Sequence, residues 1–498
     1  MIRSRAHRPP APADAVRLEP GEVFAAGERN HHVSNTAYPL AHETTFKPYR
    51  LTRDEHDARM HEAFEGVDPL CLYVHIPFCE VRCSFCEYTV VSGDDLRDTE
   101  RYMDALEQEL DLWAARLGRR RLRGFDVGGG TPAFVSERRI DALVDRVRAR
   151  FDVDADVGIS IETTPRIAAQ RPEMLRAWKA SGIDRVSMGV QVIQPDLLRV
   201  LARDGNGVEH HHRAMQHIRD AGFDRVNLDL MYGFADQSLA SFEATVAHAI
   251  GLAPEYVTLY RMRYKLTRIS HQADRVDRDL VRAQAKLAKA MLAAAGYAAN
   301  PGKNTFSKVD GDVGTSEYLT RRVIDGMPYL GLGLGAQTFT HRTISYADGS
   351  IGKNLAPYLT SIARGRLPLQ DLYDLPATQM MAKMVAVAFY FGEVDLDAFA
   401  AKFGTSFESA FPAEVGFAQR EGLMHYAERP PAPRSGIAAP RRVFALTEHG
   451  ADHFHGTIAL FFAPSIQRHL VDRRGDDAEF EKHRTLAVRV ARDGREVA

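Results

Sequence analysis

Six short apolar runs alternate with longer amphipathic stretches, and this alternation limits the possible folds more than any other feature of the chain. Each run predicts a buried strand, and the runs lie at 71–78, 125–130, 157–162, 185–191, 225–233 and 256–262. The stretches between and after them predict helices at 100–117, 136–150, 171–181, 208–221, 238–250 and 277–295. Right-handed crossovers between such strands build a parallel sheet. Six βα units are fewer than the eight of a closed barrel, so we expect an α/β fold with a partial (βα)6 barrel.

The sequence divides into four predicted segments, one of which is the barrel. We expect an N-terminal arm and extension at 1–69, of which 1–35 is a flexible arm, and the barrel with its closing segment at 70–365. Residues 366–470 contain amphipathic helices, a proline-rich loop and two apolar runs, which predict a small helical, winged-helix-like domain. The highly charged residues 471–498 predict a tail.

Composition argues against several classes of protein. The formal net charge of −2 gives no bulk attraction to nucleic acid or to anionic membranes. No apolar run is long enough to span a bilayer, and the N-terminus has no apolar core of a secretory signal. Four cysteines, one of them isolated, do not form a disulfide framework. We therefore expect a cytoplasmic protein that binds neither nucleic acid nor a membrane.

Cys79, Cys83 and Cys86 follow the first predicted strand in the pattern C-x3-C-x2-C. Chance clustering of buried thiols is one explanation. A zinc site is a second, although zinc usually takes four ligands and here only His75 could complete the set. An iron–sulfur cluster is a third, because a [4Fe–4S] cluster on three thiolates leaves one iron open to another ligand. Cys71, on the strand itself, is expected in the core.

Other unusual residues follow the later strands, where parallel sheets bind their ligands. The glycines of Gly128–Pro132 form either a tight turn or a backbone surface that a ligand can approach closely. Glu162 could cap a helix, or hold a cationic amine or a ribose hydroxyl. Asp229 would be a charge inside an apolar strand, which is rare without a partner. Arg203 is either a solvated surface charge or a carboxylate ligand.

The cysteine pattern after a first barrel strand resembles the signature of radical S-adenosylmethionine (SAM) enzymes. The stretch YVHIPFC-x3-C-x-FC is similar to the HemN-like branch, that of oxygen-independent coproporphyrinogen III dehydrogenase, and the resemblance covers roughly residues 33–465. It implies a [4Fe–4S] cluster on Cys79, Cys83 and Cys86, whose open iron binds SAM and whose electron cleaves it. An electron donor such as flavodoxin or ferredoxin is then a partner. The resemblance also implies that eight residues contact SAM: Tyr73, Gly129, Gly130, Thr131, Glu162, Gln191, Arg203 and Asp229.

The branch contains several chemistries, among them oxidative decarboxylation of porphyrinogen propionates, haem chaperones, and class C methylases and cyclopropanases that bind two SAM molecules. The dehydrogenase has a further cysteine two residues after the third ligand, whereas here Glu87 and Tyr88 follow Cys86. SNTAYP at 34–39 resembles the N-terminal segment of the dehydrogenase rather than the start of a chaperone. The segment YLGLGLGAQTFTHRTISY at 329–346 is closer to the methylases.

We therefore expect a radical SAM enzyme that uses a second SAM to methylate or cyclopropanate an sp² carbon of a small natural product. A coproporphyrinogen dehydrogenase-like decarboxylase or other porphyrin-modifying enzyme, and a haem chaperone, are the alternatives. The sequence identifies no catalytic side chain. Tyr38, Glu87 and Tyr88 are the candidates, Tyr38 because the arm could fold over the mouth of the barrel.

Overall fold

The structure is a computed structural model of the 498-residue chain. It describes residues 14, 16–30, 34–36, 38, 45–92, 96–154, 156–264, 267–431 and 440–473. The predicted tail therefore lies almost entirely outside the described residues, as do most of the predicted proline-rich loop and the first thirteen residues of the predicted arm.

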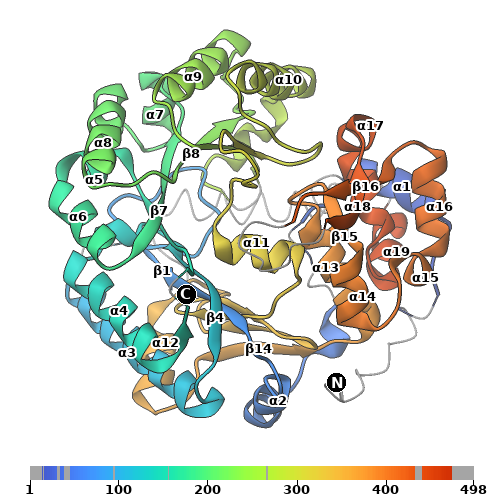
Figure 1. Ribbon diagram of the computed structural model, residues 1–498, viewed down its shortest axis with the longest axis horizontal. Coiled ribbons are helices and arrows are strands. Elements are labelled where there is room, and N and C mark those ends of the chain that lie inside the picture. Colours follow the sequence, from blue (N-terminus) through green and yellow to red (C-terminus); the bar gives the residue numbers. More distant parts are fainter. Residues whose placement is uncertain are drawn as a thin grey trace.

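Twelve strands of the described chain form the main sheet, and its parallel half is the predicted barrel. Six neighbouring strands follow the order β9-β8-β7-β6-β4-β1 and pair in parallel. They are β1 (Leu70–Ile76), β4 (Arg121–Gly129), β6 (Ile159–Thr163), β7 (Ile183–Gln191), β8 (Val226–Tyr232) and β9 (Tyr256–Arg261), with the short β5 (Asp152–Val153) beside β4. The predicted α/β fold with a partial (βα)6 barrel is confirmed, and Figure 1 shows the strands inside an incomplete ring of helices.

Helices cover the outer face of this sheet because each has one apolar stripe. In α4 the buried residues are Ile140, Leu143, Val144 and Val147, spaced three to four apart so that all of them face the strands. The covering helices are α3 (Leu96–Leu117), α4 (Glu137–Arg150), α5 (Pro165–Gln170), α6 (Pro172–Ala180), α7 (Pro195–Val200), α8 (Val208–Asp220), α9 (Leu239–Gly251) and α10 (Arg278–Ala294).

The closing segment extends the sheet in a way that the sequence analysis does not predict. Strand β11 (Tyr329–Leu332) pairs in parallel with β1, and β12 (Gln337–Phe339), β13 (Thr343–Ala347) and β14 (Leu369–Asp374) continue the sheet as antiparallel strands. At the other edge β10 (Thr305–Ser307) pairs antiparallel with β9. Helix α12 (Leu355–Ala363) lies between β13 and β14 in the sequence.

Helix α11 (Glu317–Ile324) lies in the middle of the ring in Figure 1, across the inner side of the sheet. It approaches β4 so closely that a Cβ on Gly124 would lie 2.5 Å from the Cα of Tyr318. Glycine at this position therefore allows the helix to cover one end of the barrel, while the carboxyl ends of the strands remain open.

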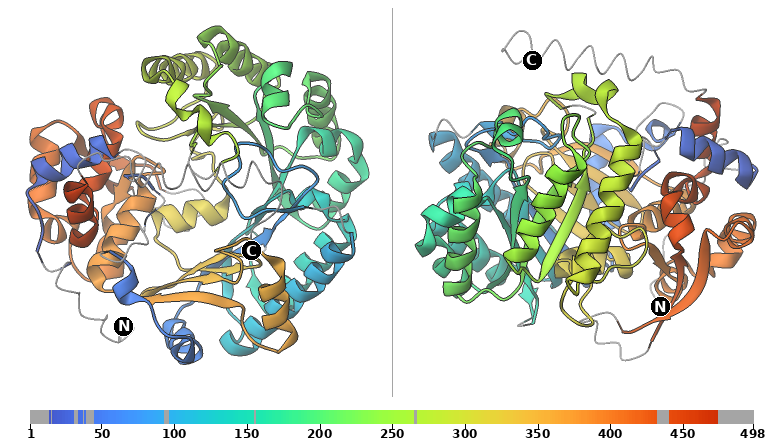
Figure 2. Two further views of the ribbon diagram at one scale, coloured as in Figure 1. Left: turned by 180° about the vertical axis from the view of Figure 1, so that it is seen from behind. Right: turned by 90° about the horizontal axis from the view of Figure 1, so that it is seen from above.

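The C-terminal part has a second hydrophobic core and lies beside the barrel in Figures 1 and 2. Its sheet has the order β15-β17-β16, formed by β15 (Glu393–Asp395), β16 (Met424–Arg429) and β17 (Arg441–Leu446). Its helices are α13 (Ala377–Ala388), α14 (Leu396–Phe403), α15 (Phe407–Ala410), α16 (Pro412–Arg420), α17 (Glu448–Asp452), α18 (Phe454–Leu460) and α19 (Pro464–Asp472). The predicted helical C-terminal region is thus present.

Helix α1 (Pro20–Arg29) packs against this C-terminal unit. Val23 and Ala26 are fully buried, and a Cβ on Gly27 would lie 2.5 Å from the carbonyl oxygen of His455. The prediction of a flexible arm over 1–35 is wrong for this helix, because its packing face consists partly of small residues that give a weak apolar pattern. The chain then reaches the barrel through η2 (Lys47–Tyr49), η3 (Arg53–Glu55) and α2 (His56–Ala63).

Among the residues that the structure describes, none of the helices combines the length and the apolar composition that crossing a bilayer requires.

Candidate active site

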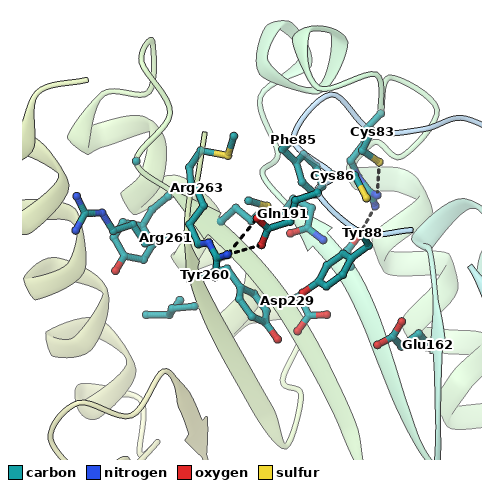
Figure 3. Close-up of a pocket in the computed structure, with 18 of the residues that line it drawn as sticks. Cys83, Phe85, Cys86, Tyr88, Glu162, Gln191, Asp229, Tyr260, Arg261 and Arg263 are labelled. Atoms are coloured by element: carbon teal, nitrogen blue, oxygen red, sulfur yellow. Dashed lines mark hydrogen bonds and ion pairs between the residues drawn. The ribbon is translucent and has the colours of Figure 1, made fainter. Parts of the chain in front are cut away.

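A cavity of about 1100 Å³ opens at the carboxyl ends of the barrel strands. Its walls come from the cysteine loop and from the ends of β4 and β6 to β9, as Figure 3 shows for the labelled residues. Asn35 and Thr36 from the N-terminal segment also line it, together with Phe389, Tyr390, Phe454 and His455 from the C-terminal unit. The cavity therefore lies between the barrel and the two chain ends that fold against it.

The cysteine loop lies between β2 (Phe78–Cys79) and β3 (Val91–Ser92), two short strands that pair with each other. The amide of Cys86 donates to the carbonyl of Cys83 at 3.1 Å, and the amide of Ser84 donates to the carbonyl of Leu201 at 3.0 Å. All three loop cysteines line the cavity as free thiols. Cys71, in contrast, is fully buried in β1, as expected of a core residue.

The surroundings of the three thiols fit a cluster better than a single metal ion. Among the described residues, no three His, Cys, Asp or Glu side chains converge closely enough to hold one metal ion. A cubane places each thiolate on a different iron, so its cysteines can lie further apart. Burial raises the pKa of Cys79 to about 12 and also raises the pKa of Cys86, so the thiolates of these two cysteines need positive charge to stabilise them.

His75 does not complete a zinc site with the cysteines. Its Nε2 lies 2.9 Å from the carbonyl oxygen of Thr89 and its Nδ1 lies 3.3 Å from the hydroxyl of Tyr73. Because a carbonyl only accepts, Nε2 carries the proton and Nδ1 accepts from Tyr73. Burial lowers the pKa of His75 to about 4, which keeps the ring neutral. Both nitrogens are thus occupied within the protein.

The glycine stretch after β4 forms a wall without side chains next to the cysteines. Gly129 has a φ of +122°, and a Cβ there would lie 2.7 Å from the ring of His75. A Cβ on Gly130 would lie 2.7 Å from the carbonyl of Pro77. Thr131, which follows, places its hydroxyl 3.3 Å from the sulfur of Cys79. A side chain at Gly129 or Gly130 would displace the neighbouring backbone or the His75 ring. Glycine at both positions therefore leaves the backbone accessible to a ligand.

Two carboxylates face the cavity beyond the glycines. Glu162 accepts a hydrogen bond from the amide of Gly129 at 3.1 Å. Asp229 accepts from the side-chain amide Nδ2 of Asn227 at 2.7 Å and from the hydroxyl of Ser187 at 3.2 Å. Enclosure by the barrel wall raises the pKa of Glu162 to about 7, with a further contribution from Asp229, and burial raises the pKa of Asp229 to about 6. A cationic ligand would favour the charged form of both groups.

Arg203 is buried beside the cysteine loop and is not a solvated surface residue. It is 7% exposed, and its Nη1 lies 3.4 Å from the sulfur of Cys83. Its Nη2 donates to the carbonyl of Gly189. Gln191, the last residue of β7, lines the same wall with a φ of +66°. Together with Tyr73, all eight residues that the resemblance assigns to SAM line the cavity.

The three catalytic candidates do not share one location. Glu87 and Tyr88 line the cavity, and the Tyr88 side chain is 62% exposed. Tyr38 does not line it. Its ring lies in the core of the C-terminal unit against Phe462, and its hydroxyl donates to Gln379. The segment around Tyr38 therefore reaches the cavity through Asn35 and Thr36 instead.

The structure also shows site residues that the sequence analysis missed. The ammonium of Lys353 donates to the carbonyls of Glu87 at 2.8 Å and Tyr88 at 2.7 Å, which fixes the end of the cysteine loop. Arg263 forms an ion pair with Glu87 at 3.0 Å. Lys353 has a φ of +50°, uncommon for a residue other than glycine, but no signal in the sequence links it to a loop some 265 residues earlier.

Residues 73–249 match the model of the radical SAM superfamily. Over this segment the chain is similar to the radical SAM superfamily, and the relatives that it matches are of the HemN-like kind. It is 33% identical over 254 residues to the oxygen-independent coproporphyrinogen III oxidase of Salmonella typhimurium, a match that covers 51% of this chain and 53% of the relative. The chain thus spans about half the length of that relative.

Two further comparisons cover more of the chain. The heme chaperone HemW of Bacillus subtilis is 25% identical over 367 residues, which are 72% of this chain and 93% of that relative. The solved structure of coproporphyrinogen III oxidase (HemN) from Escherichia coli has a TM-score of 0.69 at 22% identity, covering 86% of this chain and 96% of the other, and it shows the shared fold. Proteins of the radical SAM superfamily hold a [4Fe–4S] cluster and SAM, and the three loop cysteines of this chain lie within the matched segment.

Proposed function

We propose that this radical SAM enzyme oxidatively decarboxylates an unsaturated small molecule that carries carboxylates, and that coproporphyrinogen III is the first substrate to test. One observation carries the proposal: the three cysteines open onto a cavity of about 1100 Å³ that continues to a wall containing arginines. Ligand pockets commonly measure about 300–1000 Å³. This cavity therefore has room for SAM and a large substrate at once.

The named relatives support this proposal over the methylation or cyclopropanation that the sequence analysis favours. One group consists of oxygen-independent coproporphyrinogen III oxidases, and the other consists of heme chaperones. Both correspond to the alternatives of the sequence analysis, and both concern tetrapyrroles. The likeness to the HemN structure extends over 96% of that chain and concerns the fold.

Cys79, Cys83 and Cys86 would hold the cluster, which when bound supplies the electron that cleaves SAM. The side-chain-free backbone of Gly129 and Gly130 leaves space for the methionyl amino group of SAM. Glu162 and Asp229 would hold its cationic and ribose parts, with Tyr73, Thr131 and Gln191 completing the wall. Arg203 would bind the carboxylate of SAM while its charge stabilises the thiolate of Cys83, 3.4 Å away. A flavodoxin or ferredoxin would be the electron donor.

The C-terminal segment 366–470 would cover the substrate. Phe389, Tyr390, Phe454 and His455 from this segment line the cavity opposite the barrel. Such a cover excludes water from the reacting atoms, which protects a radical from side reactions.

Methyl transfer with a second SAM remains a second candidate because of one feature of the cysteine loop. The position two residues after Cys86 is Tyr88, whose exposed ring faces the cavity where the dehydrogenase-like pattern has a cysteine. The volume of the cavity also allows two SAM molecules.

An anaerobic product assay tests both candidates. Protein with a reconstituted cluster is supplied with SAM, a reductant and coproporphyrinogen III, and the products are identified by mass spectrometry. Release of carbon dioxide with 5′-deoxyadenosine supports decarboxylation, whereas S-adenosylhomocysteine with 5′-deoxyadenosine supports methyl transfer. Retention of haem without turnover supports a chaperone. Cys83→Ser should abolish SAM cleavage, and Cys71→Ser, which changes a core cysteine on β1, should not. If the wild type does not cleave SAM, the proposal is wrong.

A further inference from the structure

Two arginines at the end of the cavity remote from the cysteines have no acidic partner. Arg261 ends β9 and Arg278 begins α10, and both line the cavity. In the described part of the chain, neither guanidinium takes part in an ion pair or hydrogen bond, not even with Asp274 on the same wall. Figure 3 shows the side chain of Arg261 pointing away from Cys83 and Cys86.

Neighbouring arginines make this pair unusual. Arg263, two residues after Arg261, is paired with Glu87 at 3.0 Å. Arg275 is paired with Asp236 at 3.1 Å, and Arg282, one turn after Arg278, is paired with Asp279 at 3.0 Å. The chain therefore neutralises the arginines around this rim, except for the two that face the cavity together.

Positive charge gathers at this end, where Asp274 is a carboxylate on the same wall. Burial lowers the pKa of Arg261, and the charges of Arg278 and Arg282 lower it further, while Tyr232 acts in the opposite direction. Arg261 also acts electrostatically on His455 of α18, which places the arginine opposite the C-terminal unit. Both Arg261 and Arg278 are exposed to solvent, so an anion that enters the cavity can reach both guanidinium groups.

Several aromatic residues line the cavity. They are Phe85, Tyr88, Tyr260, Phe389 and Tyr390. A flat unsaturated body fits such walls, while an anionic group at one end of that body would reach the arginines. The guanidinium plane suits a carboxylate, which it can bind through two parallel hydrogen bonds.

We propose that Arg261 and Arg278 form a carboxylate-binding subsite that anchors the acidic end of an unsaturated substrate on the side of the cavity remote from the cysteines. This inference rests on the proposed function, which makes the cavity the active site. It adds two residues that would select an acidic substrate. It makes both arginines determinants of specificity, since neither lies near the thiols.

Binding of an aromatic carboxylate tests the subsite without requiring turnover. The probes are 1-pyrenebutyrate and its neutral counterpart 1-pyrenebutanol, titrated by fluorescence anisotropy against anaerobic protein with a reconstituted cluster. We expect Arg261→Gln and Arg278→Gln each to weaken pyrenebutyrate binding about tenfold. Arg261→Lys should recover part of the affinity, because lysine keeps the charge but not the planar fork.

Matched controls separate recognition of the carboxylate from damage to the fold. Arg282→Gln changes an arginine on the same helix that already has a carboxylate, so it should leave the affinity for pyrenebutyrate unchanged. Binding of pyrenebutanol should be equal in all variants, which shows that the aromatic walls are intact. The proposal is overturned if pyrenebutyrate binds no better than pyrenebutanol, if it does not bind at millimolar concentration, or if both glutamine variants bind it as the wild type does.

Failure of this inference differs from failure of the proposed function. Carbon dioxide release from coproporphyrinogen III, with pyrenebutyrate binding that does not depend on the arginines, overturns the subsite alone. Arginine-dependent binding without any carbon dioxide release overturns the decarboxylation and keeps the subsite for another acidic substrate.

Discussion

One buried carboxylate, Glu109 of α3, holds the glycine-rich closing segment against the barrel, and we predict that Glu109→Gln changes stability in a pH-dependent way. Glu109 is 1% exposed. Its Oε2 accepts hydrogen bonds from the hydroxyl of Tyr358 at 2.7 Å and the amide of Gly333 at 2.8 Å. Burial raises the pKa of Glu109 from 4.5 to about 7, against the opposing effect of these hydrogen bonds.

The sign of the effect follows from proton linkage. Between about pH 4.5 and pH 7 the folded chain holds the Glu109 proton more tightly than the unfolded chain does. Stability from this group is therefore complete at low pH, falls as the pH rises through this interval, and stays reduced above about pH 7. A difference of about 2.5 pH units corresponds to about 3 kcal/mol, at about 1.4 kcal/mol per unit.

Glutamine carries no charge at any of these pH values. The free energy of unfolding of Glu109→Gln, relative to that of the wild type, should therefore increase by about 3 kcal/mol from about pH 4.5 to pH 8. Subtraction of the two proteins cancels every other titrating group, because both chains share them.

Urea denaturation of anaerobically purified protein, followed by circular dichroism at several pH values, measures this difference. Tyr358→Phe is the companion variant. It removes a hydrogen bond to the carboxylate, so the loss of stability with rising pH should become larger than in the wild type. The reasoning is refuted if the difference in free energy of unfolding between Glu109→Gln and the wild type stays the same from pH 4.5 to pH 8. Glu109 would then have the same pKa in the folded and the unfolded chain.

Three further predictions concern the cavity. Cys83→Ser should reduce the iron bound after reconstitution, measured by iron analysis and visible absorbance, because two thiolates do not hold a cubane stably. Glu162→Gln should flatten the pH dependence of SAM affinity, measured by equilibrium dialysis. Between about pH 6 and pH 8 the wild type should gain roughly threefold to tenfold over the variant, since the Glu162 pKa is about 7 and water in the cavity screens part of its charge. Lys353→Met should raise the rate at which a chelator removes iron from the protein several-fold, because two main-chain carbonyls of the cysteine loop lose their hydrogen-bond donor.

The parallel strands were predictable because each is mostly buried and contains a short, mainly apolar run. The later strands were not. Strand β12 has three residues and β11 four, and glycines separate them, so no run is long enough to give a period. Helix α1 was missed for a related reason, since its contact with α18 depends on Gly27 and on small neighbouring residues.

In the site, too, the residues with a local sequence pattern were predictable, and those that depend on long-range packing were not. Cys79, Glu162 and Asp229 lie on or directly after predicted strands, and the topology of a parallel sheet alone brings the ends of those strands together. Lys353 reaches the cysteine loop only because the closing segment folds back across the barrel, a contact that no local pattern encodes. Tyr38 shows the converse, because Asn35 and Thr36 line the cavity while the side chain of Tyr38 enters the C-terminal core.

The cavity is electrically polarised, and this polarity orders its ligands. Near the cysteines the wall presents Glu162 and Asp229, with Arg203 occupied at Cys83. A sulfonium cation is therefore stabilised at this end, where an acidic substrate would be repelled once both carboxylates ionise. At the other end Arg261 and Arg278 attract an anion and repel a cation. If the proposed function holds, a sulfonium cation would lie beside the cysteine loop and an acidic substrate beyond it, so the unsaturated body of that substrate would lie between the two charged ends.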